Sequence, residues 1–134
     1  PTMTARLPAG TEAARPFLPT RDFAVSRDFY LALGFEMLLD GEVAIFRVGG
    51  SGQGFILQRH YQQAWAENTM LQLMVDDLDV WWAHLLALDL PRQFEVQPPK
   101  PPALQPWGLR VVYLYDPAGV LWHVSQRRPE VTWD

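Results

Sequence analysis

The stretch that decides the fold reads RDFAVSRDFYLALGF and runs from Arg21 to Phe35. Its apolar residues recur at helical spacing, which predicts a helix over about 22–33. Asp22 is placed to cap the first turn, because its carboxylate can accept free amide protons there. Gly34 ends the helix, since glycine tolerates a left-handed backbone. A short strand precedes this helix and three strands follow it, at 17–20, 35–39, 43–48 and 54–59.

The same order of elements returns in the second half of the chain. We expect a strand at 69–75, a helix capped by Asp76 and Asp77, and strands at 94–96, 109–115 and 120–126. The run PPKPP at 98–102 predicts an extended loop, because proline cannot donate hydrogen bonds to a sheet. A shift of 55 residues aligns Leu-Ala-Leu at 31–33 with Leu-Ala-Leu at 86–88. The sequence therefore predicts one α+β domain at 13–134, made of two βαβββ modules at about 13–59 and 68–126, behind a mobile lead-in at 1–12.

Composition narrows the classes of function. Hydrophobic residues make up 49% of the 134 residues and charged residues 19%, a balance typical of a globular protein. The absence of cysteine excludes disulfides, thiolate metal sites and cysteine nucleophiles. A net charge of -4 argues against nucleic acid as a partner and is compatible with a cationic ligand. The apolar runs are too short to span a membrane and no secretion signal opens the chain, so we expect a cytoplasmic protein.

Several motifs carry a resemblance to a known family. Paired βαβββ modules with Leu-Gly-Phe at 33–35, Val-Asp-Asp-Leu at 75–78 and Asp-Pro-Ala-Gly at 116–119 resemble the vicinal oxygen chelate superfamily. That superfamily contains glyoxalases, extradiol dioxygenases, fosfomycin-resistance enzymes and bleomycin-resistance proteins. Leu-Pro-Thr-Arg-Asp-Phe at 18–23 and Leu-Gln-Pro-Trp-Gly at 104–108 are similar to segments of the bleomycin-resistance proteins. This resemblance implies a curved mixed sheet that forms a cup, and a homodimer that exchanges strands.

The resemblance also implies four metal-ligand positions, on the first, fourth, fifth and eighth strands. Counting from the helix caps and from Gly119 places them near Arg15, Gln58, Met70 and His123. A guanidinium is itself a cation, and Gln58 and His123 alone are too few donors for a divalent metal. We therefore expect neither a metal nor another cofactor. Loss of the Lewis acid disfavours an enzyme, and a metal-dependent lyase or dioxygenase is the alternative.

A cup without a metal can still bind a ligand by shape, stacking and charge. Trp107 is the first candidate for stacking on a planar or cationic group, although packing against a dimer partner explains it equally well. Trp65 either closes over a ligand or is a plain surface aromatic. If His123 faces inward, it shares a face with Leu121 and Ser125, because successive strand residues alternate. The other candidates, each of which ordinary core packing would also explain, are Gln58, Gln72, Met70, Phe46 and Tyr113.

These observations predict a metal-free small-molecule binding protein of the bleomycin-resistance type. Its ligand would be an antibiotic or a similar aromatic or cationic compound, sequestered in a cleft. A binding domain for another apolar or aromatic metabolite remains a further alternative.

Overall fold

The computed structural model describes residues 6–127. The elements in chain order are β1 (Phe17–Pro19), α1 (Phe23–Leu33), β2 (Glu36–Asp40), β3 (Ala44–Arg47), β4 (Gly54–Gln58), α2 (Gln63–Glu67), β5 (Met70–Val75), α3 (Leu78–Leu88), α4 (Leu90–Phe94), β6 (Lys100–Leu104), β7 (Arg110–Tyr115) and β8 (Leu121–Gln126). Along this described stretch, none of the helices has the length and apolar character that a membrane crossing requires. Part of the predicted lead-in, residues 1–5, lies outside the described residues.

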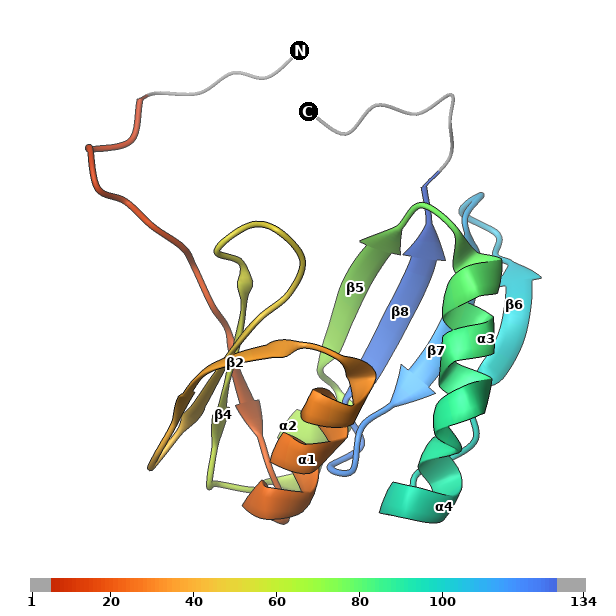
Figure 1. The fold of residues 1–134 in the computed structure, drawn as a ribbon, viewed down its shortest axis with the longest axis horizontal. Helices are drawn as coiled ribbons and strands as arrows, with labels where there is room; N and C mark the ends of the chain where they lie inside the picture. The colour runs from red at the N-terminus through yellow and green to blue at the C-terminus, as the bar shows by residue number, and fades with distance from the viewer. Residues whose placement is uncertain (1–5, 128–134) are drawn as a thin grey trace.

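The strands form two four-stranded sheets, one from each half of the chain (Figure 1). Sheet A has the order β1-β4-β3-β2 and sheet B the order β5-β8-β7-β6. In each sheet the first strand pairs with the last in parallel, and the other neighbours are antiparallel. The predicted α+β class, with two βαβββ modules, is confirmed.

The first long helix begins and ends where the sequence predicts, and the second begins at its predicted cap. The Asp22 carboxylate accepts a hydrogen bond from the amide of Val25 at 3.3 Å, and Gly34 adopts a φ of 103° at the end of α1. The Asp77 carboxylate accepts hydrogen bonds from the amides of Asp79 and Val80 at the start of α3. These caps satisfy amides that have no partner within the helix.

Two predictions for the segment after α3 are wrong. The strand expected at 94–96 is absent, because Phe94 ends the short helix α4. The proline-rich run is not a loop throughout, since Lys100–Leu104 is strand β6. It lies at the edge of sheet B, and its pairing with β7 shifts register between Lys100 and Ala103. An edge strand with a bulge tolerates prolines, because half of its amides need no partner in the sheet.

A buried polar contact joins the two modules. The hydroxyl of Tyr30 on α1 donates to Asp116 at 2.7 Å and accepts from the indole Nε1 of Trp122 at 2.9 Å. Asp116 also accepts from the amides of Ala118 and Val120. Burial raises the pKa of Asp116 to about 6, against the opposing effect of these hydrogen bonds. The aromatic side chains around Tyr30 fix the packing of the helix of one module on β8 of the other.

Candidate functional site

Sheet B turns one face toward α3, and we call the opposite face the distal face. Trp122 and Val124 belong to the core, whereas Leu121, His123 and Ser125 alternate with them on β8. The register of the sheet extends the distal face to its other strands. The positions on this face are Met70, Gln72, Met74, Lys100, Ala103, Val111, Tyr113, Tyr115, Leu121, His123 and Ser125. None of them is an aspartate or a glutamate.

One row of polar side chains crosses all four strands of the distal face. Gln72 on β5 pairs with His123 on β8, and His123 pairs with Tyr113 on β7. Tyr113 in turn pairs with Lys100 on β6. The rows on either side are mostly apolar: Met70 and Leu121 with Tyr115, and Met74 with Ser125, Val111 and Ala103. The polar row therefore runs between two less polar ones.

Trp107 lies beside this row. It sits in the turn at 105–109 that joins β6 to β7, where the amide of Gly108 donates to the carbonyl of Gln105 at 2.9 Å. Its ring centroid is 6.2 Å from that of His123, and the two planes are tilted by 37°. Its residue exposure is 54%, so one side of the indole is free to contact another molecule.

His123 occupies the centre of the site. Its ring meets the ring of Tyr113 edge-on at 4.9 Å. The Nε2 atom is buried and has no hydrogen-bond partner among the described residues. Burial lowers the pKa of His123 below its usual value of 6.5, so the imidazole is neutral at pH 7. A buried ring nitrogen without a partner is unfavourable, and a bound molecule could supply the missing hydrogen bond.

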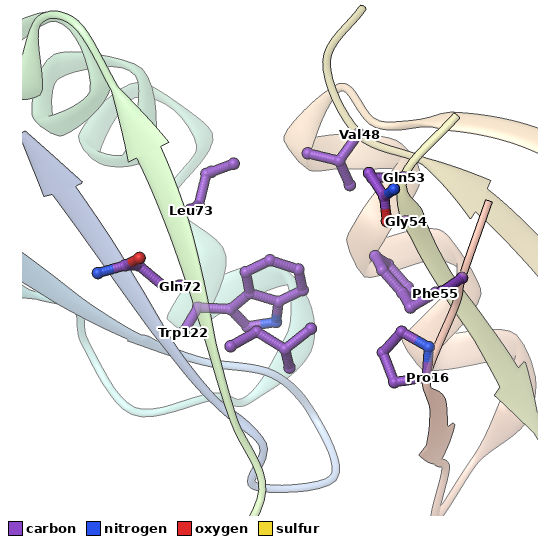
Figure 2. A pocket seen from close by; sticks show the side chains of 10 residues that line it. Pro16, Val48, Gln53, Gly54, Phe55, Gln72, Leu73 and Trp122 are labelled. Atoms are coloured by element: carbon purple, nitrogen blue, oxygen red, sulfur yellow. The ribbon is translucent and has the colours of Figure 1, made fainter. Parts of the chain in front are cut away.

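A small hollow opens next to His123. It has a volume of about 190 Å³ and is lined by Met70, Leu71, Gln72 and His123. A separate apolar cleft of about 220 Å³ lies between the modules, with Trp122 and Leu73 on one side and Phe55 and Pro16 on the other (Figure 2). Gln72 also lines this cleft, and in Figure 2 its side chain points away from Phe55 and Pro16 on the opposite wall. Leu71 and Gln72 on β5 line both spaces, whereas Leu73 lines only the cleft and Met70 only the hollow.

The residues at the expected metal positions do not fit a divalent metal. Met70 and His123 share the distal face of sheet B, but Met70 pairs with Leu121, and the residue opposite His123 is Gln72. Gln58 is on β4 of the other module, and Arg15 precedes β1 and forms an ion pair with Glu12 at 3.8 Å. Within residues 6–127 no three histidine, aspartate or glutamate side chains are grouped to hold a metal ion. The donor chemistry here is an amide, an imidazole and a thioether.

The structure brings together five of the eight predicted ligand-binding residues: Trp107, Gln72, His123, Tyr113 and Met70. Phe46 is placed elsewhere. It is fully buried and stacks on Phe55 at 5.3 Å in the core of the first module, because it faces α1. Trp65 lies on α2 with its ring 6.3 Å from His60, and Gln58 pairs with Pro19 on sheet A.

Lys100 is the residue of the distal face that sequence reasoning missed. It is the only lysine of the chain, and it is exposed at the end of the polar row. Because the surrounding prolines predict a loop, the sequence did not indicate that Lys100 lies on a strand. The alternation of Val111 and Tyr113 identifies β7 as a strand, but no local pattern identifies the segment that pairs with it.

Comparisons with solved structures give the same fold at low sequence identity. A bleomycin-binding protein complexed with bleomycin is 28% identical, with a TM-score of 0.68 over 88% of this chain and 100% of the other. A bleomycin resistance determinant encoded on the transposon Tn5 is 27% identical, with a TM-score of 0.69 over 88% of this chain and 99% of the other. An antibiotic-binding protein from Streptomyces sp. CB03234 is 21% identical and shares the fold, with a TM-score of 0.71 over 92% of this chain and all of the other.

No family model matches the sequence, and no curated protein matches it. The similarity therefore rests on structure: this chain has paired βαβββ modules, and its fold matches these proteins over nearly their full length. With these features, the chain has the fold of the vicinal oxygen chelate superfamily and is similar to bleomycin-binding proteins of that superfamily.

Proposed function

We propose that the chain binds a planar aromatic small molecule, an antibiotic of the bleomycin type or a similar compound, and sequesters it without chemical change. The ligand lies on the distal face of sheet B, against Trp107 and His123. The observation that carries the proposal is the half-exposed indole of Trp107 beside the unpartnered Nε2 of His123. The similar structures of a bleomycin-binding protein and a bleomycin resistance determinant support the class of ligand.

The chemistry of the site favours binding over catalysis. Stacking on an indole contributes about 0.5–2 kcal/mol for an aromatic or cationic group, which suits recognition by shape. The donors at the expected metal positions do not suit a divalent ion, and the buried carboxylate of Asp116 is engaged in the contact between modules. The proposed mechanism is therefore removal of the free ligand by binding.

A second copy of the chain would complete the site. Large apolar side chains remain exposed on both modules, among them Phe17, Leu39 and Met70 at 52%, 48% and 63%. Apolar surface of this kind commonly marks an interface. We propose a homodimer, with strand exchange as its form, in which the partner covers this surface. Sedimentation equilibrium tests the assembly: a mass of twice 15.3 kDa supports it, and a monomer at high micromolar concentration contradicts it.

Titration with metal-free bleomycin, followed by tryptophan emission, tests the ligand. We expect saturable quenching in the wild-type protein and a loss of affinity in Trp107→Ala. Trp81→Phe is the matched control, because Trp81 lies on α3 against His84. If the wild-type protein gives no response at high micromolar bleomycin, bleomycin is not the ligand. If Trp81→Phe weakens binding as much as Trp107→Ala, the site is elsewhere.

A further inference from the structure

The polar row on the distal face lacks polar partners within the part of the chain that the structure describes. Among the described residues, the side chains of Gln72, Tyr113 and Lys100 form no hydrogen bond or ion pair, and the Nε2 of His123 has none either. Four neighbouring polar groups are therefore available to one bound molecule. Most other charged side chains at strand positions are paired, for example Arg47 with Glu36 and Arg110 with Asp79.

The row is rich in hydrogen-bond donors. The lysine ammonium, the tyrosine hydroxyl and the glutamine amide all donate, and the ammonium cannot accept. No carboxylate occupies the distal face, so its strand positions carry one positive charge and no negative charge. The chain as a whole has a net charge of -4, but the strand positions of the distal face are positively charged. This local charge disfavours binding of a cation at the polar row.

The row also has the dimensions of a small aromatic compound. Neighbouring strands lie about 4.8 Å apart, so Lys100 is about 10 Å from His123 across β7. A lysine side chain spans about half of that distance. The ammonium can therefore reach a substituent on a ring that stacks on Trp107 beside His123. Tyr113 lies between the two and can donate to the same substituent.

We propose that the distal face recognises a planar aromatic group through acidic oxygen substituents, a carboxylate above all, with Lys100 as the residue that determines this preference. Trp107 supplies the stacking surface, and Tyr113 and Gln72 donate to ligand oxygens. This inference rests on the proposed function and narrows it: at sheet B it favours a planar aromatic group with an acidic substituent over a cationic one.

Three probes with one ring system test it: 9-anthracenecarboxylate, 9-anthracenemethanol and 9-anthracenemethylammonium. Binding is measured by calorimetry at pH 7.5 in low salt. We expect the carboxylate to bind about fivefold more tightly than the neutral alcohol, a partly exposed ion pair being worth about 1 kcal/mol. The ammonium should bind more weakly than the alcohol. The preference should shrink as salt is added, because the charges are near solvent.

Variants assign the preference to one residue. Lys100→Met should reduce carboxylate affinity to that of the alcohol, and Lys100→Arg should restore it. Arg92→Met is the control for overall charge, because Arg92 is an exposed cation on α4. Lys100 is itself exposed at a sheet edge, and circular dichroism checks that each variant folds.

The outcomes separate the two proposals. If the alcohol binds and Lys100→Met leaves the carboxylate-to-alcohol ratio unchanged, the inference is wrong and the proposed function stands. Equal or tighter binding of the ammonium also overturns the inference. If none of the three probes binds the wild-type protein, the inference is overturned, and the bleomycin titration decides separately whether the proposed function stands.

Discussion

The burial of Asp116 beside Tyr30 makes stability depend on pH in a direction that can be calculated. The pKa of Asp116 is about 6 in the folded protein, against an ordinary value of 3.8. The folded state therefore binds this proton more tightly, so stability from this group is present at low pH and is lost as pH rises through 6. This difference between the folded and ordinary pKa of Asp116 adds about 3 kcal/mol to the free energy of unfolding at low pH. About 1.4 kcal/mol of that is gained between pH 8 and pH 5.

The assay is urea unfolding followed by tryptophan fluorescence at pH 8 and pH 5. Subtracting the pH response of Asp116→Asn from that of the wild-type protein isolates the contribution of Asp116. We expect the wild-type free energy of unfolding to gain about 1.4 kcal/mol more than the variant's on going to pH 5.

Tyr30→Phe provides a second measurement. The tyrosine hydrogen bond lowers the pKa of Asp116, so its removal should steepen the pH dependence. Parallel responses of the wild-type protein and Asp116→Asn would refute the reasoning, because they would mean that Asp116 ionises normally when folded.

Three other predictions concern the site and the core. Trp107→Ala should weaken ligand binding in calorimetry by about 2- to 30-fold. In urea unfolding it should change the free energy of unfolding by less than about 0.5 kcal/mol. A change in stability without a change in affinity would count against a binding role. Phe46→Ala should cost about 3–5 kcal/mol of stability in urea unfolding, because it empties a core position, and a loss below about 1 kcal/mol would place Phe46 at the surface. Excess Zn²⁺ or Ni²⁺, or removal of metals by EDTA, should leave the midpoint temperature of thermal unfolding unchanged. A rise of several degrees with one metal would indicate a metal site that the donor side chains do not suggest.

The sequence was sufficient to predict the modules because their signals are local. Asp22, Asp77 and Gly34 mark helix ends through contacts within a few residues, and the structure confirms each. The alternation on β8 likewise predicted that His123 shares a face with Ser125.

Features that depend on pairing between distant strands were harder to predict. The proline-rich run gives no local sign that Lys100 lies opposite Tyr113, and the facing of Phe46 depends on how β3 pairs with β4. The distance along the chain between Tyr30 and Asp116 similarly concealed their contact. Local sequence patterns were enough to predict the helices and most strands. Which residues meet in the site depends on the register between the strands of sheet B, and local patterns do not contain that information.

The most direct test of the central claim is a map of where the ligand binds. In ¹H–¹⁵N spectra of the protein titrated with 9-anthracenecarboxylate, we expect shifts at the indole of Trp107, the side-chain amide of Gln72 and the backbone of His123. The indoles of Trp81 and Trp82 on α3 should not move. Shifts confined to α3, or to Trp122 in the cleft between the modules, would contradict a ligand site on the distal face of sheet B.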